Sequence, residues 1–139
     1  MLRAIPVLFV SFAVLAAAGS IRAGEPDEDL ALTERGAKIL EPLEPTGETR
    51  SCIDITRIQS SRVLGDRAIL FELKGHGLWL NILDNRCPSL AAQDQFTYSL
   101  STSQLCSTDV VTVLMRGIGP GASCGLGSFL GYREKPAGE

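Results

Sequence analysis

Four cysteines constrain this 139-residue chain more than any other feature. They are Cys52, Cys87, Cys106 and Cys124, and all of them follow an apolar N-terminal segment. An even number of cysteines behind an export signal is typical of a disulfide-bonded domain, because exported thiols become oxidised. Four cysteines allow three pairings. We predict Cys52–Cys124, which would join the first strand of the domain to the last, and Cys87–Cys106, which would close a shorter loop.

The N-terminal segment, residues 1–23, is predicted to be a secretory signal peptide. Arg3 supplies the positive charge, residues 7–18 form the apolar run, and Ala23 ends a small-residue cleavage site. Cleavage after Ala18 is an alternative. A membrane anchor is another interpretation, but the apolar run is shorter than the roughly 20 residues that a spanning helix needs. We therefore expect a periplasmic or secreted protein with no transmembrane segment in the mature chain.

The charge of the remaining chain is divided unevenly. Residues 24–49 carry eight acidic side chains against Arg35 and Lys38, which predicts an acidic leader or linker with a short helix within residues 27–40. Such a leader is either a solvated tether or a segment that docks a partner. Residues 50–132 are predicted to form the folded domain and residues 133–139 a C-terminal tail. Residues 50–139 hold nine basic and eight acidic side chains without a basic cluster, which argues against nucleic-acid binding.

Short alternating segments rich in β-branched residues predict an all-β domain. Residues 68–73 and 78–83 flank a glycine-containing turn and predict an antiparallel hairpin. Residues 109–115 are apolar on both faces and predict a central strand. The expected fold is a small antiparallel barrel or sandwich that disulfides stabilise and an acidic leader precedes.

The cysteines also belong to a set of short motifs. These are Cys-Ile at 52–53, Asn-Arg-Cys-Pro at 85–88, Phe-Thr-Tyr at 96–98, Leu-Cys-Ser-Thr-Asp at 105–109 and Cys-Gly-Leu-Gly-Ser-Phe at 124–129. Over about residues 50–130 the chain resembles a bacterial family of small exported domains of unknown function. The resemblance implies a domain that begins near Cys52 behind a variable leader. It implies no activity, cofactor or catalytic residue.

Three aromatic residues, Trp79, Phe96 and Tyr98, are the best candidates for a binding surface. If Leu78 and Leu80 face the core, the alternation of the strand turns Trp79 outward. An outward tryptophan beside other rings can stack on sugars or anchor a partner. The alternative is that the region around Phe96, or the leader, covers Trp79.

The sequence shows no catalytic or metal-binding constellation. The cysteines lack the short paired spacing of zinc ligands. His76 stands between two turn glycines, with no nucleophile motif beside it. Asp109 lies close to Cys106 just before the predicted central strand, where we expect its side chain to cap a turn.

We therefore expect a non-enzymatic binding module or an envelope-associated structural module. We expect no cofactor and no metal, and a partner that is a protein or another envelope component. The alternative is a small hydrolase, or a protease inhibitor that presents the loop from Ser89 to Gln95.

Overall fold

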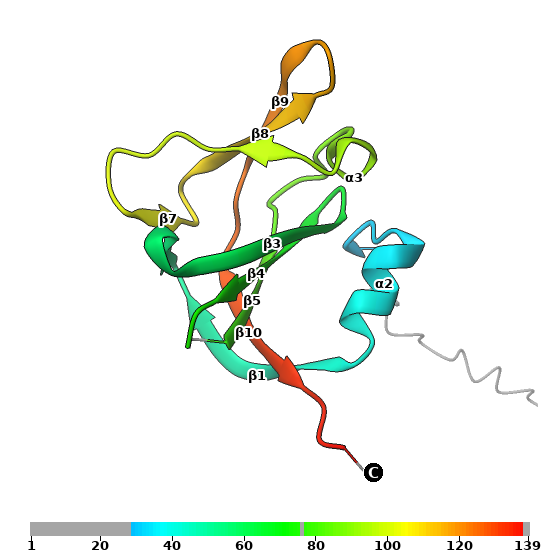
Figure 1. Ribbon diagram of the computed structural model, residues 1–139, viewed down its shortest axis with the longest axis vertical. Helices are drawn as coiled ribbons and strands as arrows, with labels where there is room; N and C mark the ends of the chain where they lie inside the picture. Colours follow the sequence, from blue (N-terminus) through cyan, green and yellow to red (C-terminus); the bar gives the residue numbers. More distant parts are fainter. Residues whose placement is uncertain (1–28, 76, 138–139) are drawn as a thin grey trace, which may run out of the picture.

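The structure, a computed structural model, describes residues 29–75 and 77–137 (Figure 1). The predicted signal peptide at 1–23, the start of the leader at 24–28, and His76 lie outside the described residues. The elements are, in chain order, α2 (Glu34–Leu40), β1 (Leu43–Arg50), β2 (Cys52–Asp54), the 3-10 helix η1 (Ile55–Arg57), β3 (Ile58–Gly65), β4 (Ala68–Leu73), β5 (Gly77–Ile82), α3 (Leu90–Gln93), β6 (Phe96–Thr97), β7 (Gln104–Cys106), β8 (Val110–Met115), β9 (Gly119–Gly125) and β10 (Phe129–Glu134).

The strands form three antiparallel sheets, which confirms the predicted all-β class. A five-stranded sheet has the order β1-β10-β5-β4-β3, a three-stranded sheet has the order β6-β8-β9, and β2 pairs with β7. The sheets do not close into a barrel, so the architecture is sandwich-like. The predicted hairpin is β4–β5, and the predicted central strand is β8, which lies between β6 and β9.

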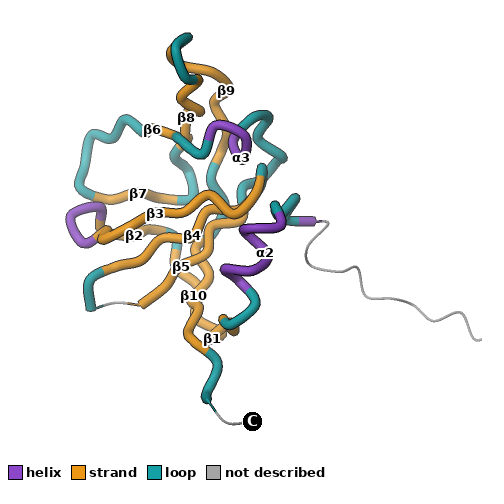
Figure 2. Tube along the Cα trace, turned by 45° about the vertical axis from the view of Figure 1, so that its right-hand side comes forward, coloured by secondary structure: helices purple, strands orange, loops and turns teal. Residues whose placement is uncertain are grey.

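Both faces of the five-stranded sheet are covered. Alternation along β4 turns Ile69 and Phe71 into the larger core, which the shorter strands also line, and turns Ala68 and Leu70 into a second core beside α2. Figures 1 and 2 show α2 on the right of this sheet and β7 on the left. A strand covered on both faces reads as a continuous apolar run, which explains the composition of β4.

The leader belongs to the folded domain, so the predicted domain boundary at residue 50 is wrong. The segment predicted as an extended linker contributes β1, which pairs with β10. The predicted helix is present as α2, and Thr33 caps it by accepting a hydrogen bond from the backbone of Gly36 at 2.9 Å. A Cβ at Gly36 would clash with the carbonyl of Leu64, so glycine permits the close approach of α2 to β3. At the other end of the chain, β10 extends to Glu134, into the predicted tail.

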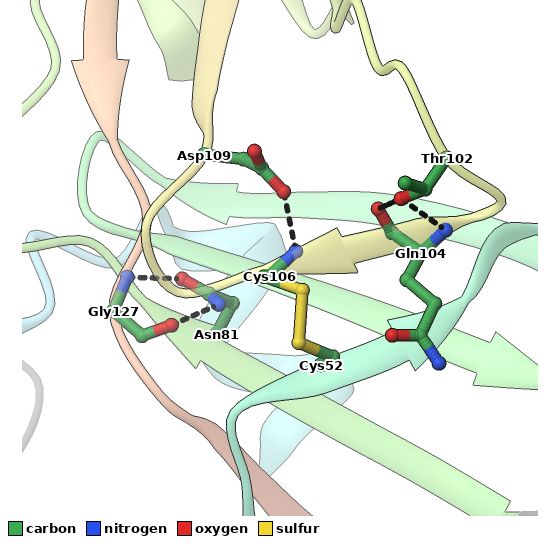
Figure 3. Close-up of a disulfide and its surroundings, with 7 residues drawn as sticks. All are labelled: Cys52, Asn81, Thr102, Gln104, Cys106, Asp109 and Gly127. Atoms are coloured by element: carbon green, nitrogen blue, oxygen red, sulfur yellow. Dashed lines mark hydrogen bonds between the residues drawn. A yellow bond between two sulfur atoms is a disulfide. The ribbon is translucent and has the colours of Figure 1, made fainter.

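All four cysteines form disulfides, but the predicted pairing is wrong. The pairs are Cys52–Cys106 and Cys87–Cys124. The prediction placed the first cysteine-bearing strand beside the last strand, whereas β1 occupies that place. Cys52 lies on β2 instead, directly opposite Cys106 on β7, with 4.0 Å between the Cα atoms (Figure 3).

The second disulfide joins the segment after β5 to β9. Cys87 is fully buried, and its backbone N–H donates to the carbonyl of Asp66 at 2.6 Å. Nearby, the N–H of Asp84 donates to the carbonyl of Gly125 at 3.3 Å, which brings this segment beside β9. The first disulfide therefore crosslinks the two strands of the β2-β7 sheet, and the second ties the segment after β5 to the three-stranded sheet.

A buried asparagine fixes the segment that precedes β10. Asn81 is fully buried on β5, where its Nδ2 donates to the carbonyl of Gly127 at 2.7 Å (Figure 3). Its Oδ1 accepts from the N–H of Gly127 at 3.0 Å. One side chain therefore satisfies both polar groups of a buried residue that stands outside any strand ladder, as buried backbone groups require.

Candidate functional site

The structure buries the tryptophan that the sequence predicted to be exposed. Trp79 is 2% exposed and belongs to the larger core cluster. The alternation of β5 is as predicted, but the face opposite Leu78 and Leu80 is also covered. The guanidinium of Arg50 lies 4.3 Å from the centre of the Trp79 ring. Trp79 therefore serves packing, and the prediction that it faces outward as a binding residue is wrong.

The other two predicted aromatic residues pack against the same core. Phe96 lies 6.2 Å from Phe71 and 6.4 Å from Tyr98 between ring centres. Both Phe96 and Tyr98 are partly buried against the larger cluster. Trp79, Phe96 and Tyr98 thus share one core, which gives the aromatic residues a role in packing.

The residues considered for catalysis are not assembled into a site in the part of the chain that the structure describes. Asp109 Oδ2 accepts from the backbone N–H of Cys106 at 2.7 Å, which confirms the predicted turn-capping role (Figure 3). His76 lies outside the described residues. The segment from Ser89 to Gln95, considered as an inhibitory loop, contains α3 and the fully buried Leu90. Within the described ranges no group of three or more His, Cys, Asp or Glu could hold a metal ion.

A depression lies on the α2 side of the five-stranded sheet. Residues on adjacent strands stand opposite one another there: Ser60 pairs with Glu72, Glu72 with Leu78, and Leu78 with Tyr132. Opposed residues share a face of the sheet. Because Leu78 and Tyr132 pack against the core beside α2, the whole row lies on that side. We call this row and its surroundings the α2-side groove.

The wall of the groove comes from the leader. Ile39 of α2, Pro42 of the following turn and Leu43 of β1 line it on one side. The floor adds Leu70, and the groove, which is open to solvent, has a volume of about 660 Å³. That volume lies within the range of small-molecule sites, which are mostly apolar concavities with a few polar groups. The groove therefore has the size and the lining of a ligand site.

The groove also carries polar and charged side chains, which are Ser60, Arg62, Glu72, Tyr132, Arg133 and Glu134. Ser60 Oγ donates to Glu72 Oε2 at 3.0 Å. Burial raises the pKa of the Tyr132 hydroxyl. Arg133 forms an ion pair with Glu44 at 2.9 Å. Arg62 forms no ion pair within the described ranges. These groups can orient a ligand by hydrogen bonding and charge.

Sequence reasoning missed this groove for two reasons. The leader was assigned to a linker, so its contribution to a wall was not anticipated. The acidic residues of the folded domain, Glu72 among them, show no distinguishing spacing in the sequence. A signal was nevertheless present, because Glu72 is the single charged residue of the otherwise apolar segment 68–73.

No family model, curated protein or solved structure matches this chain. The resemblance to exported domains of unknown function stays a prediction. Of the helices in the described residues, none has the length and apolar character needed to cross a membrane.

Proposed function

We propose that this protein is an exported, non-enzymatic binding module that holds its ligand in the α2-side groove. The observation that carries the proposal is the groove itself. A concavity of about 660 Å³ has a floor of leucine and tyrosine side chains and is also lined by Ser60 and by charged residues. An apolar floor supplies affinity and the polar groups supply orientation.

The scaffold around the groove supports this function. The floor residues lie on interior strands β4, β5 and β10, whose opposite face is packed into the larger core. A site built on paired strands holds its geometry more closely than a site built on loops. Binding to such a preformed site requires little ordering of the protein, which preserves affinity.

The proposed compartment is periplasmic or extracellular. Both disulfides are typical of proteins that fold under oxidising conditions. The apolar segment at residues 1–23 would direct the chain there. The physiological ligand would then be a molecule of the cell envelope or of the surroundings.

The proposal is tested with an uncharged apolar fluorophore, N-phenyl-1-naphthylamine, whose emission rises in apolar surroundings. The oxidised protein, purified after export, should enhance the emission in a saturable manner. The variant Leu78→Ser removes an apolar side chain from the floor and should lower the affinity at least several-fold, because burial of a leucine-sized surface is lost.

A matched control removes an exposed apolar side chain far from the groove. Ile118, in the turn between β8 and β9, is 77% exposed, and Ile118→Ser should bind the fluorophore as the unaltered protein does. Equal binding by the unaltered protein and Leu78→Ser would refute the groove as the site. Loss of binding in Ile118→Ser alone would move the site to the β8–β9 turn.

A further inference from the structure

We propose that the α2-side groove selects a small ligand with a protonated primary amine beside an apolar body, and that Glu72 receives the amine. This inference rests on the function proposed above and specifies its ligand class. The argument depends on where the charged groups of the groove stand and on what each of them already binds.

Glu72 occupies an unusual place for a carboxylate. Five of the six residues of β4 are buried, and Glu72 is the exception, partly buried in the interior of the sheet. Its hydrogen-bond partner is the neutral hydroxyl of Ser60 at 3.0 Å. Within the described ranges Glu72 belongs to none of the four ion pairs. A partly desolvated carboxylate without a cation favours a ligand that brings one.

The neighbours of Glu72 define the rest of the ligand. Leu78 stands directly opposite Glu72, and Tyr132 stands opposite Leu78 on the next strand. Adjacent strands are about 4.8 Å apart, so the apolar patch begins roughly one strand spacing from the carboxylate and ends about two spacings away. An amine attached to a short aliphatic or aromatic body would place its charge on Glu72 and its body over Leu78 and Tyr132.

The other charges of the groove favour a cation over an anion. Arg133 is engaged by Glu44, and Glu134 adds a second carboxylate to the lining. Arg62 also lines the groove, but its side chain is exposed, so water screens its charge. A ligand carboxylate over Leu78 would lie beside Glu72, its like charge, in the less solvated part of the groove.

The experiment compares three probes with the same apolar body. Octylamine, which is protonated at neutral pH, 1-octanol and octanoate are titrated calorimetrically into the oxidised, exported protein below their micellar concentrations. We expect octylamine to bind about tenfold or more tightly than octanoate, with 1-octanol between them, because a charge-assisted hydrogen bond adds to a shared apolar contribution.

Two variants separate charge from structure. Glu72→Gln keeps the shape and the acceptor for Ser60, and should abolish the preference for octylamine by lowering its affinity to about that of 1-octanol. Ser60→Ala keeps the carboxylate and should keep the preference. Thermal unfolding of both variants verifies that they fold.

The outcomes separate this inference from the function on which it rests. Equal affinities for the three probes, or a preference for octanoate that Arg62→Gln removes, would overturn the amine inference and leave the groove as a binding site. Binding of the uncharged fluorophore without binding of any octyl probe would do the same. Failure of the fluorophore and of all three probes would reject both proposals.

Discussion

The substitution Asn81→Ala tests the idea that one buried side chain fixes the segment before β10. Asn81 is fully buried, and it both donates to and accepts from the backbone of Gly127, at 2.7 and 3.0 Å. Gly127 is itself buried, and a Cβ there would clash with the carbonyl of Ile82. The segment therefore has little freedom to turn its polar groups toward water once the asparagine side chain is removed.

The expected loss of stability follows from the two hydrogen bonds between Asn81 and Gly127. Leaving a buried backbone donor or acceptor without a partner costs about 1–3 kcal/mol each. Loss of both partners of Gly127 should lower the free energy of unfolding by about 2–6 kcal/mol. Domains of this size are stable by about 5–15 kcal/mol, so the variant should be strongly destabilised and still partly foldable.

Equilibrium unfolding in urea measures this effect, and the chain carries its own probe. Trp79 is the sole tryptophan and is 2% exposed in the folded protein, so its fluorescence reports the loss of the larger core. Asn81→Ala should lower the urea midpoint without changing the slope of the transition. Asn81→Asp would place a carboxylate oxygen against the carbonyl of Gly127 in a fully buried site, so at neutral pH it should destabilise the protein at least as strongly as Asn81→Ala.

A matched control uses an asparagine that lies outside the core. Asn85 is exposed after β5, and Asn85→Ala should change the free energy of unfolding by about 0.5 kcal/mol or less. A loss below about 1 kcal/mol in Asn81→Ala would refute the reasoning, because the two backbone groups would then have found other partners.

Three further predictions follow from other parts of the structure. Gly36→Ala should destabilise the domain by about 1–3 kcal/mol in the urea assay by pushing α2 off β3, and an unchanged midpoint would contradict that contact. Burial raises the pKa of Tyr132 above its ordinary value of 10.0, so the unfolded state loses this proton first. Stability should therefore fall above about pH 10 more steeply than in Tyr132→Phe, and parallel curves would contradict this. Non-reducing peptide mapping should recover Cys52 linked to Cys106, whereas a link to Cys124 would reject the arrangement of β2 and β7.

Sequence patterns predicted the strands better than they predicted what covers them. The β4–β5 hairpin and the central position of β8 follow from alternation and from apolar runs, which are local signals. The burial of Trp79 does not follow from β5 alone. It depends on segments more than ten residues away, among them Phe96, which pack over the second face of the same sheet.

The pairing of the cysteines was not predictable for a related reason. Sequence order made Cys52 the first anchor of the predicted domain, so pairing with the last strand was reasonable. The leader carries β1, which takes the place beside β10, and β2 then pairs with β7. A polar segment can join a sheet where the rest of the fold leaves a strand edge unpaired. The composition of the segment does not show whether such an edge exists.

The α2-side groove shows the same dependence at the level of function. Its floor comes from β4, β5 and β10, β3 adds polar side chains, and Ile39, Pro42 and Leu43 of its wall come from the leader. This role of the leader could not be predicted from its composition, because acidic residues dominate it and few apolar side chains of α2 and β1 face the sheet. Glu72 alone gave a signal, as a charge inside an apolar strand. If the floor sets the chemistry of the ligand and the leader sets the shape of the cavity, substitutions in the leader should change ligand size preference more than they change charge preference.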